Sequence, residues 1–312
     1  MSTSSTPAPT TEMQQLRSAL PTLTNFLHTF ASSTSNFSLL TTITTSSAFP
    51  PSFAHPPTTL PTAPKTLYIL DSSYNPPTLA HLRIATSALL HDTQPYTSPR
   101  RLLLLLATQN ADKAPKPASF EHRLTMMTIF ARDLLSSLPP PKESSKKELA
   151  IDIGVTKLPY FHDKASSIAD SGIYPNETQQ IHLLGYDTLT RLLSTKYYSP
   201  NNLSILAPFF SSHRVRVTYR PDSSTSYKSS REEQDRYIND LREGKKEEEG
   251  GRREWVTEGR IEMVEGRKEG EEVVSSTRVR EAIKNGDREL LDKLVTSGVK
   301  EWVLREGLYL DD

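Results

Sequence analysis

Residues 72–81, Ser-Ser-Tyr-Asn-Pro-Pro-Thr-Leu-Ala-His, place a threonine and a histidine three positions apart, directly after an apolar run. Pro76 and Pro77 stiffen the turn and Thr78 is a good N-cap residue, so the pattern predicts that a helix begins here. Thr78 and His81 would share one face of its first turn. Backbone amides at a helix N-terminus attract phosphate, so this pair could bind a nucleoside triphosphate. A capping threonine beside a semi-buried histidine explains the same residues equally well.

A second cluster, Ser-Ser-Thr-Arg-Val-Arg at residues 275–280, opens an amphipathic helix. Its hydroxyl side chains, including Ser276 and Thr277, can cap the helix and leave backbone amides free for an anion. Arg278 and Arg280 add charge-assisted donors. Two arginines in a first turn oppose the helix dipole, and a bound anion would resolve that conflict. The cluster therefore favours phosphate binding over plain capping.

Two further polar clusters follow other apolar runs. Gly185 would let a ligand approach the backbone closely, and Asp187 could accept hydrogen bonds from ribose hydroxyls or simply cap the next helix. In the segment 110–123, Lys113 and Lys116, with Arg123 in the following helix, could face the same phosphates. Loop lysines are mostly solvated, so this segment is the weaker indication.

An alternation of predicted strands and helices, beginning at Lys65, would position these clusters. Strands are expected at 66–70, 101–107, 148–155, 181–185, 214–220 and 260–265, and helices at 78–90, 120–138, 187–193, 276–286, 287–295 and 298–307. This order predicts an α/β fold, a Rossmann-like doubly wound parallel sheet with C-terminal helices. Ligands bind outside the carboxyl ends of strands in such sheets, where the polar clusters fall.

The chain divides into three kinds of segment. Residues 1–64 are rich in serine, threonine and proline, and are expected to form a mostly flexible N-terminal extension with one helix at about 12–31. Residues 65–312 are expected to form the α/β domain that carries the polar clusters. Within it, residues 221–257 form a highly charged insertion, interpreted as a solvated segment with one helix at about 229–242, or alternatively as a partner-binding segment.

Composition narrows the classes of partner. The 312 residues contain 37 Lys+Arg and 37 Asp+Glu, so there is no basic excess for nucleic acid. Cysteine is absent, which excludes disulfides and a thiolate nucleophile. The longest apolar run, 102–107, is far below the roughly 18 residues that span a bilayer. We expect no nucleic-acid or membrane partner and a cytoplasmic or nuclear location, with mitochondrial targeting as the alternative; the oligomeric state is left open.

Taken together and in this order, the clusters resemble the nucleotidyltransferase superfamily with its T/HxGH and ISSTxxR signatures. Within it they look most like nicotinamide mononucleotide (NMN) adenylyltransferases, particularly a fungal branch. The family's G-S-F-N-P-x-T-x-x-H matches residues 72–81, its S-S-T-x-x-R matches 275–280, and its G-x-D matches 185–187. Its V-T-R strand end matches 217–220, which is one residue longer. The resemblance covers about residues 66–312, apart from the charged insertion.

The resemblance implies a reaction in which the 5′-phosphate of NMN attacks the α-phosphorus of ATP in line, giving NAD and pyrophosphate. It implies Mg²⁺ bound with ATP and no metal bound by the protein itself. It also implies the following roles: catalysis by His81, Thr78 and Arg280; ATP and phosphate binding by Ser72, Ser73, Lys113, Ser276, Thr277 and Arg278; ribose and nucleotide binding by Gly185, Asp187 and Arg220; and stacking on the nicotinamide by Tyr160, Phe161, Tyr197 or Tyr198.

Three positions depart from the family pattern. Ser72 replaces a glycine, which would tighten the approach of the backbone to adenosine, and Ala80 stands before the essential histidine. Leu158 falls near an expected tryptophan, so either aromatic pair could stack on the nicotinamide or belong to the core. The alternatives are adenylyl transfer to nicotinate mononucleotide or another phosphomonoester, ATP hydrolysis, and a nucleotide-binding scaffold without catalysis.

Overall fold

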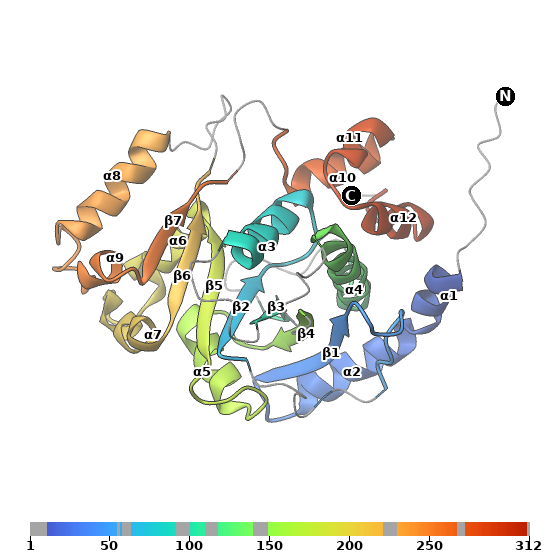
Figure 1. The fold of residues 1–312 in the computed structure, drawn as a ribbon, viewed down its shortest axis with the longest axis horizontal. Helices are drawn as coiled ribbons and strands as arrows, with labels where there is room; N and C mark the ends of the chain where they lie inside the picture. Colours follow the sequence, from blue (N-terminus) through green and yellow to red (C-terminus); the bar gives the residue numbers. More distant parts are fainter. Residues whose placement is uncertain are drawn as a thin grey trace.

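A seven-stranded sheet forms the centre of the computed structural model, which describes residues 11–54, 57, 64–91, 100–109, 118–139, 149–220, 230–266 and 272–310 (Figure 1). The strands are β1 (Phe37–Thr44), β2 (Thr66–Asp71), β3 (Arg100–Ala107), β4 (Ala150–Thr156), β5 (Gln179–Gly185), β6 (Arg214–Thr218) and β7 (Ile261–Val264). Their order is β1-β4-β3-β2-β5-β6-β7. Strands β2 to β7 are parallel, and β1 runs antiparallel to β4. The predicted doubly wound, mostly parallel α/β fold is therefore confirmed.

Both faces of the sheet are covered by helices, because the central strands are apolar on both sides. The helices are α1 (Thr11–Ser18), α2 (Leu20–Ser32), α3 (Leu79–His91), α4 (Phe120–Ser137), α5 (Phe161–Asp170), α6 (Tyr186–Leu192), α7 (Ala207–Ser212), α8 (Arg231–Arg242), α9 (Glu254–Thr257), α10 (Ser276–Lys284), α11 (Arg288–Asp292) and α12 (Ser297–Arg305). Short 3₁₀ turns lie at Thr195–Tyr197 and Leu203–Leu206. None of the helices among the described residues is long and apolar enough to cross a membrane.

Alternation along β2 shows how the two faces are divided. Tyr68 and Leu70 join the large core that includes residues of α3, α4 and α12, whereas Leu67 and Ile69 pack with Ile168 of α5 on the other face. The strand order reverses at β2, which lies between β3 and β5. In doubly wound sheets this reversal opens a crevice at the carboxyl ends of the strands. The fold thus places a candidate site where β2 and β5 end.

The N-terminal segment differs from the expectation of a mostly flexible extension. Residues 11–44 form α1, α2 and β1, and the helices bury Leu16, Leu23 and Phe30 in the main core. Strand β1 pairs with β4 along its length, with one register shift after Leu39. Serine and threonine content suggested flexibility, but β-branched threonine is also well suited to a pleated strand. The folded part therefore begins well before residue 65.

A buried ion pair joins β1 to the sheet's interior. Arg101 of β3 donates to both carboxylate oxygens of Asp152 of β4, from Nε at 2.9 Å and from Nη2 at 2.8 Å. Asp152 also accepts from Thr42 of β1 at 2.7 Å and from the Tyr174 hydroxyl at 2.9 Å. A buried charge pair is tolerated when its remaining oxygens are hydrogen-bonded, as here. The hydroxyls of Thr42 and Tyr174 therefore complete the hydrogen bonding of the buried Asp152 carboxylate.

The charged insertion is also more ordered than the sequence suggested. In its described part, residues 230–257, Ile238 and Leu241 of α8 and Trp255 of α9 are buried in a second apolar core. The Trp255 ring stacks on Phe210 of α7 with 4.5 Å between centroids. Sparse apolar residues spaced along a highly charged helix are enough to bury one face. This part of the insertion is thus packed against the body of the protein, at the β7 edge (Figure 1).

We expect Leu23→Ala to lower the free energy of unfolding by about 2–5 kcal/mol, because it leaves a cavity in the main core. The adjacent, exposed Thr22→Ala should change it by less than about 0.5 kcal/mol. Urea unfolding followed by circular dichroism measures both. Equal stability of the two variants would mean that α2 is not part of the folded unit.

Candidate active site

The loop between β2 and α3 is held rigidly at the carboxyl end of β2. The Ser72 N–H donates to the carbonyl of Leu105 in β3 at 3.2 Å. Tyr74 has a positive φ of 46°, is fully buried, and donates its hydroxyl to the Leu70 carbonyl at 2.5 Å. The Asn75 side-chain oxygen accepts from the Tyr309 hydroxyl at 2.8 Å. These contacts fix the backbone that leads into Thr78 and His81.

His81 is oriented by its neighbours as a hydrogen-bond donor. Its Nδ1 lies 3.0 Å from the backbone N of Thr78 and 2.9 Å from the Thr78 hydroxyl. A backbone N–H can only donate, so Nδ1 is the acceptor and the neutral ring carries its proton on Nε2; this tautomer is assigned from the hydrogen bonds. Nε2 lies 2.8 Å from the Ser72 hydroxyl and therefore donates to it. The predicted Thr78–His81 pair is thus a direct contact.

Burial makes the imidazole of His81 neutral. The ring is half-buried beside Tyr74 and Phe130, with centroids 5.4 and 6.5 Å away, and burial lowers the pKa of His81 to about 4. A neutral ring protonated on Nε2 cannot take a proton from Ser72, so these two residues do not form a base-activated nucleophile. The arrangement instead suits donation to an anionic oxygen that displaces the serine.

Helix α10 is joined to this loop, although the two segments lie about 200 residues apart in the sequence. Ser276 donates from Oγ to the Pro76 carbonyl at 2.8 Å. Arg280 donates from Nη1 to the Asn75 carbonyl at 2.9 Å and lies 3.3 Å from the Thr277 hydroxyl through Nη2. Two helix N-termini, those of α3 and α10, are therefore brought together with a guanidinium and several hydroxyls. Phosphate is the ligand that such a set of donors suits.

Not every residue of the second cluster points into this arrangement. The backbone N–H of Arg278 donates to the capping Ser275 hydroxyl at 3.2 Å. Its guanidinium pairs with Glu272 at 2.5 Å and with the Val273 carbonyl, both in the segment preceding α10. The phosphate-binding roles expected for Arg278, for the exposed Ser73 and for the other residues of the site stay predictions. Lys113 and Lys116 lie outside the described residues.

Asp187 and Arg220 form an ion pair beyond the ends of two neighbouring strands. Gly185 ends β5 and lies opposite Thr218, the last residue of β6. A Cβ added to Gly185 would meet no atom within 4 Å, so the space before it is open to a ligand. Two of the three residues predicted to bind ribose and nucleotide, Asp187 and Arg220, are therefore brought together, with a carboxylate acceptor beside a guanidinium donor.

Three of the four aromatic candidates pack in the second apolar core. Tyr198 is buried and donates its hydroxyl to the Leu192 carbonyl at 2.8 Å, and Tyr197 and Phe161 pack against the same core. Tyr160 and Phe161 follow β4 at the start of α5, where Tyr160 is half-buried and stacks on His162 with 6.0 Å between centroids. This position near a strand's carboxyl end favours Tyr160 over the two tyrosines that pack in the core.

A buried ion pair beside this site was not predicted from the sequence. Asp71, the last residue of β2, pairs with Lys164 of α5, and both side chains are almost inaccessible. Lys164 also lies 5.3 Å from the centroid of the Phe161 ring. The pair ties the start of α5 to the residue before Ser72. Charged residues 93 positions apart offer no local pattern that would reveal such a contact.

Comparison with known proteins shows the family to which the chain belongs. A Schizosaccharomyces pombe protein described as a "Putative nicotinamide mononucleotide adenylyltransferase" is 32% identical over 232 residues, which cover 74% of this chain and 81% of that protein. The chain belongs to the nicotinamide mononucleotide adenylyltransferase family. It is therefore a nucleotidyltransferase of NAD biosynthesis. No protein-family model matches the chain.

Solved structures give a weaker likeness. Two structures of Plasmodium falciparum nicotinic acid mononucleotide adenylyltransferase, complexed with APC and with NaAD, are each 12% identical and cover 78% of this chain and 97% of their own. Their TM-scores are 0.47 and 0.45. Because both scores lie below 0.5, membership of the nicotinamide mononucleotide adenylyltransferase family rests on the S. pombe protein.

We expect stability to fall as the pH decreases from about 6.5 to about 4. Burial lowers the pKa values of His81 and His213 to about 4, and also lowers those of His122 and His182. The unfolded chain then binds more protons than the folded chain in this window, so stability rises with pH and is complete above about 6.5. His81 and His213 contribute at most about 3 kcal/mol each.

Urea unfolding at pH 7.5 and pH 5.0 measures this loss. The variant His213→Asn keeps an acceptor near the backbone N–H of Gln180, which lies 3.4 Å from Nδ1 of His213. We expect it to lose less stability than the wild type between the two pH values. An unchanged loss in this variant would contradict the role of His213.

Proposed function

We propose that the protein transfers the adenylyl group of ATP to NMN, forming NAD and pyrophosphate. The observation that carries the proposal is the junction between α10 and the loop 72–78, through the Ser276–Pro76 and Arg280–Asn75 hydrogen bonds. It sets His81 and the N-termini of α3 and α10 around one space suited to a triphosphate. Membership of the NMN adenylyltransferase family supports NMN as the acceptor.

In the proposed reaction, the side chains position the substrates and stabilise charge. A 5′-phosphate oxygen of NMN attacks the α-phosphorus of ATP, the bond from that phosphorus to the bridging oxygen breaks, and pyrophosphate leaves with the electron pair. The His81 Nε2–H is proposed to donate to a phosphate oxygen in place of Ser72. The hydroxyl proton of Ser276 is donated to the Pro76 carbonyl, so Ser276 would bind the departing phosphates through its backbone N–H, together with Thr277 and Arg280. Such in-line transfer depends on positioning and electrostatic stabilisation, which preorganised donors supply.

We propose that Mg²⁺ enters as the complex with ATP. The described donors around the space are hydroxyls, a neutral imidazole and a guanidinium, and these suit phosphate oxygens rather than a cation. Mg²⁺ is commonly held by substrate phosphates with few protein ligands. When bound it would neutralise charge on the triphosphate, together with Lys113.

The two nucleosides would be bound by different residues. Asp187 and Arg220, at the ends of β5 and β6, are proposed to hold the ribose of ATP. Tyr160, which precedes α5 and whose ring lies 6.1 Å from that of Tyr198, is proposed to stack on the nicotinamide ring of NMN. The triphosphate is proposed to lie in front of His81.

His81→Ala should lower kcat/KM for NAD formation roughly a hundredfold, equivalent to about 3 kcal/mol, because a donor to the developing charge is lost. Steady-state assays with ATP, Mg²⁺ and NMN measure the effect. His28→Ala, which removes an exposed histidine of α2, is the matched control and should retain full activity. Unimpaired turnover by folded His81→Ala protein would refute the assigned role.

The identity of the acceptor is tested with the wild-type protein. ATP and Mg²⁺ are incubated with NMN, with nicotinate mononucleotide or with no acceptor, and dinucleotide, pyrophosphate and inorganic phosphate are quantified. We expect NAD and pyrophosphate in equal amounts with NMN. Dinucleotide from nicotinate mononucleotide alone would change the acceptor, phosphate without dinucleotide would indicate ATP hydrolysis, and bound but unchanged ATP would indicate a scaffold.

A further inference from the structure

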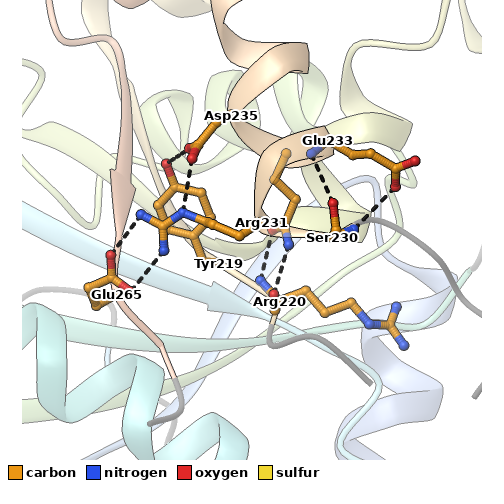
Figure 2. A network of polar contacts seen from close by, with 8 residues as sticks. Tyr219, Arg220, Ser230, Arg231, Glu233, Asp235 and Glu265 are labelled. Carbon is orange, nitrogen blue, oxygen red and sulfur yellow. Dashed lines mark hydrogen bonds and ion pairs between the residues drawn. The ribbon is translucent and has the colours of Figure 1, made fainter. Parts of the chain in front are cut away.

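The first turn of α8, in the charged insertion, docks on the two residues that leave β6 (Figure 2). Gln234 of this turn is fully buried. Its Oε1 accepts from the backbone N–H of Arg220 at 2.9 Å, and its Nε2 donates to the Arg220 carbonyl at 2.7 Å. One side-chain amide therefore binds both backbone polar groups of Arg220, as a neighbouring strand would.

Tyr219, the preceding residue, is held by the same helix. The guanidinium of Arg231 lies 3.4 Å from the centroid of the Tyr219 ring, and Asp235 accepts from the Tyr219 hydroxyl at 2.6 Å. Arg231 in turn makes two hydrogen bonds with Glu265, at 2.8 and 3.0 Å (Figure 2). The Tyr219 N–H donates to the Val264 carbonyl at 3.0 Å. The backbone beyond β6 is thus clamped between α8 and the end of β7.

The side chain of Arg220 leaves this clamped backbone and reaches Asp187. The Arg220 side chain is 33% exposed and that of Asp187 is 61% exposed. An ion pair this exposed contributes little to its own stability, because water screens the charges and the long side chain loses conformational freedom. The direction of the guanidinium therefore depends on where its backbone is fixed, and Gln234 is the group that fixes it.

We propose that Gln234 is a positioning residue for nucleotide binding: it sets the backbone of Arg220 so that the guanidinium and Asp187 meet the ribose of ATP. This inference rests on the proposed function, since it takes ATP as the ligand of that pair. It gives the described part of the insertion a role at the site, in place of a solvated segment. The described part of the insertion reaches the proposed nucleotide site through Arg220, so we expect it to influence affinity for ATP rather than the transfer step.

The test is a double-mutant cycle on KM for ATP. Gln234→Leu removes both hydrogen bonds at similar volume, and should raise KM for ATP about tenfold while kcat at saturating ATP stays within about twofold. KM for NMN should not change. In an Arg220→Met background, Gln234→Leu should have no further effect on KM for ATP. A merely structural residue would lower stability without this coupling to Arg220.

Two further variants keep the test decisive. Gln234→Glu retains the acceptor for the Arg220 N–H but not the donor to its carbonyl, so it should give an intermediate KM and serves if Gln234→Leu fails to fold. Asn239→Leu makes the same amide-to-leucine change at an exposed position of α8, and should leave KM unchanged. Each KM and kcat is calculated from the concentration of folded protein, which urea unfolding determines for every variant.

The outcomes separate this inference from the proposed function. Calorimetric titration with ATP alone gives Kd for each variant without any turnover, and should follow the same pattern as KM. Equal increases from Gln234→Leu with and without Arg220 would overturn the positioning role, as would no increase in either glutamine variant. An unchanged affinity of the Arg220→Met variant for ATP would also overturn the positioning role. That result would leave the proposed function intact, because the wild-type protein would still form NAD. Failure of the wild type to form NAD would instead refute the proposed function.

Discussion

Two backbone carbonyls, those of Asn75 and Pro76, are the point on which the arrangement of the site depends. They accept hydrogen bonds from Arg280 and Ser276, and so join the start of α10 to the loop before α3. Each segment by itself offers a single helix N-terminus with capping side chains. The junction brings the two helix starts together as one set of donors. The sheet beneath serves to present those carbonyls at a fixed place.

That place is fixed by buried contacts rather than by exposed charge. The hydroxyl of Tyr74 returns to the end of β2, and Tyr309 from the C-terminal segment reaches the side chain of Asn75. Leu79 donates its backbone N–H to the Leu294 carbonyl at 2.9 Å. The C-terminal helices therefore brace the same loop that α10 contacts. Donors that are already in place when charge develops need no reorganisation, which is the main source of electrostatic catalysis.

The strands and helices that could be predicted are those marked by a pattern of neighbouring residues in the sequence. The runs at β2 and β3 are apolar on both faces, and Thr78 and Ser275 are recognisable starts of helices, so six strands and these two helix starts could be predicted from the sequence. Strand β1 was not predicted, because Phe37–Thr44 mixes threonine with apolar residues. It also pairs with β4, in which Asp152, the partner of Thr42, lies 110 residues further along the chain. The Asp71–Lys164 pair and the Gln234 clamp were also missed, since each joins residues whose proximity exists only in the folded chain.

These missed contacts share a location. Lys164 pairs with the last residue of β2, Gln234 binds Arg220 after β6, and Arg231 pairs with the residue after β7. Strand interiors are fixed by ladders of backbone hydrogen bonds, but their carboxyl ends leave the ladder where ligands bind. Side chains must supply the missing constraints there, and their partners come from whichever helix lies nearest. Precision at the site is therefore set by long-range polar contacts, which explains why motif residues can be read from sequence while the groups that position them cannot.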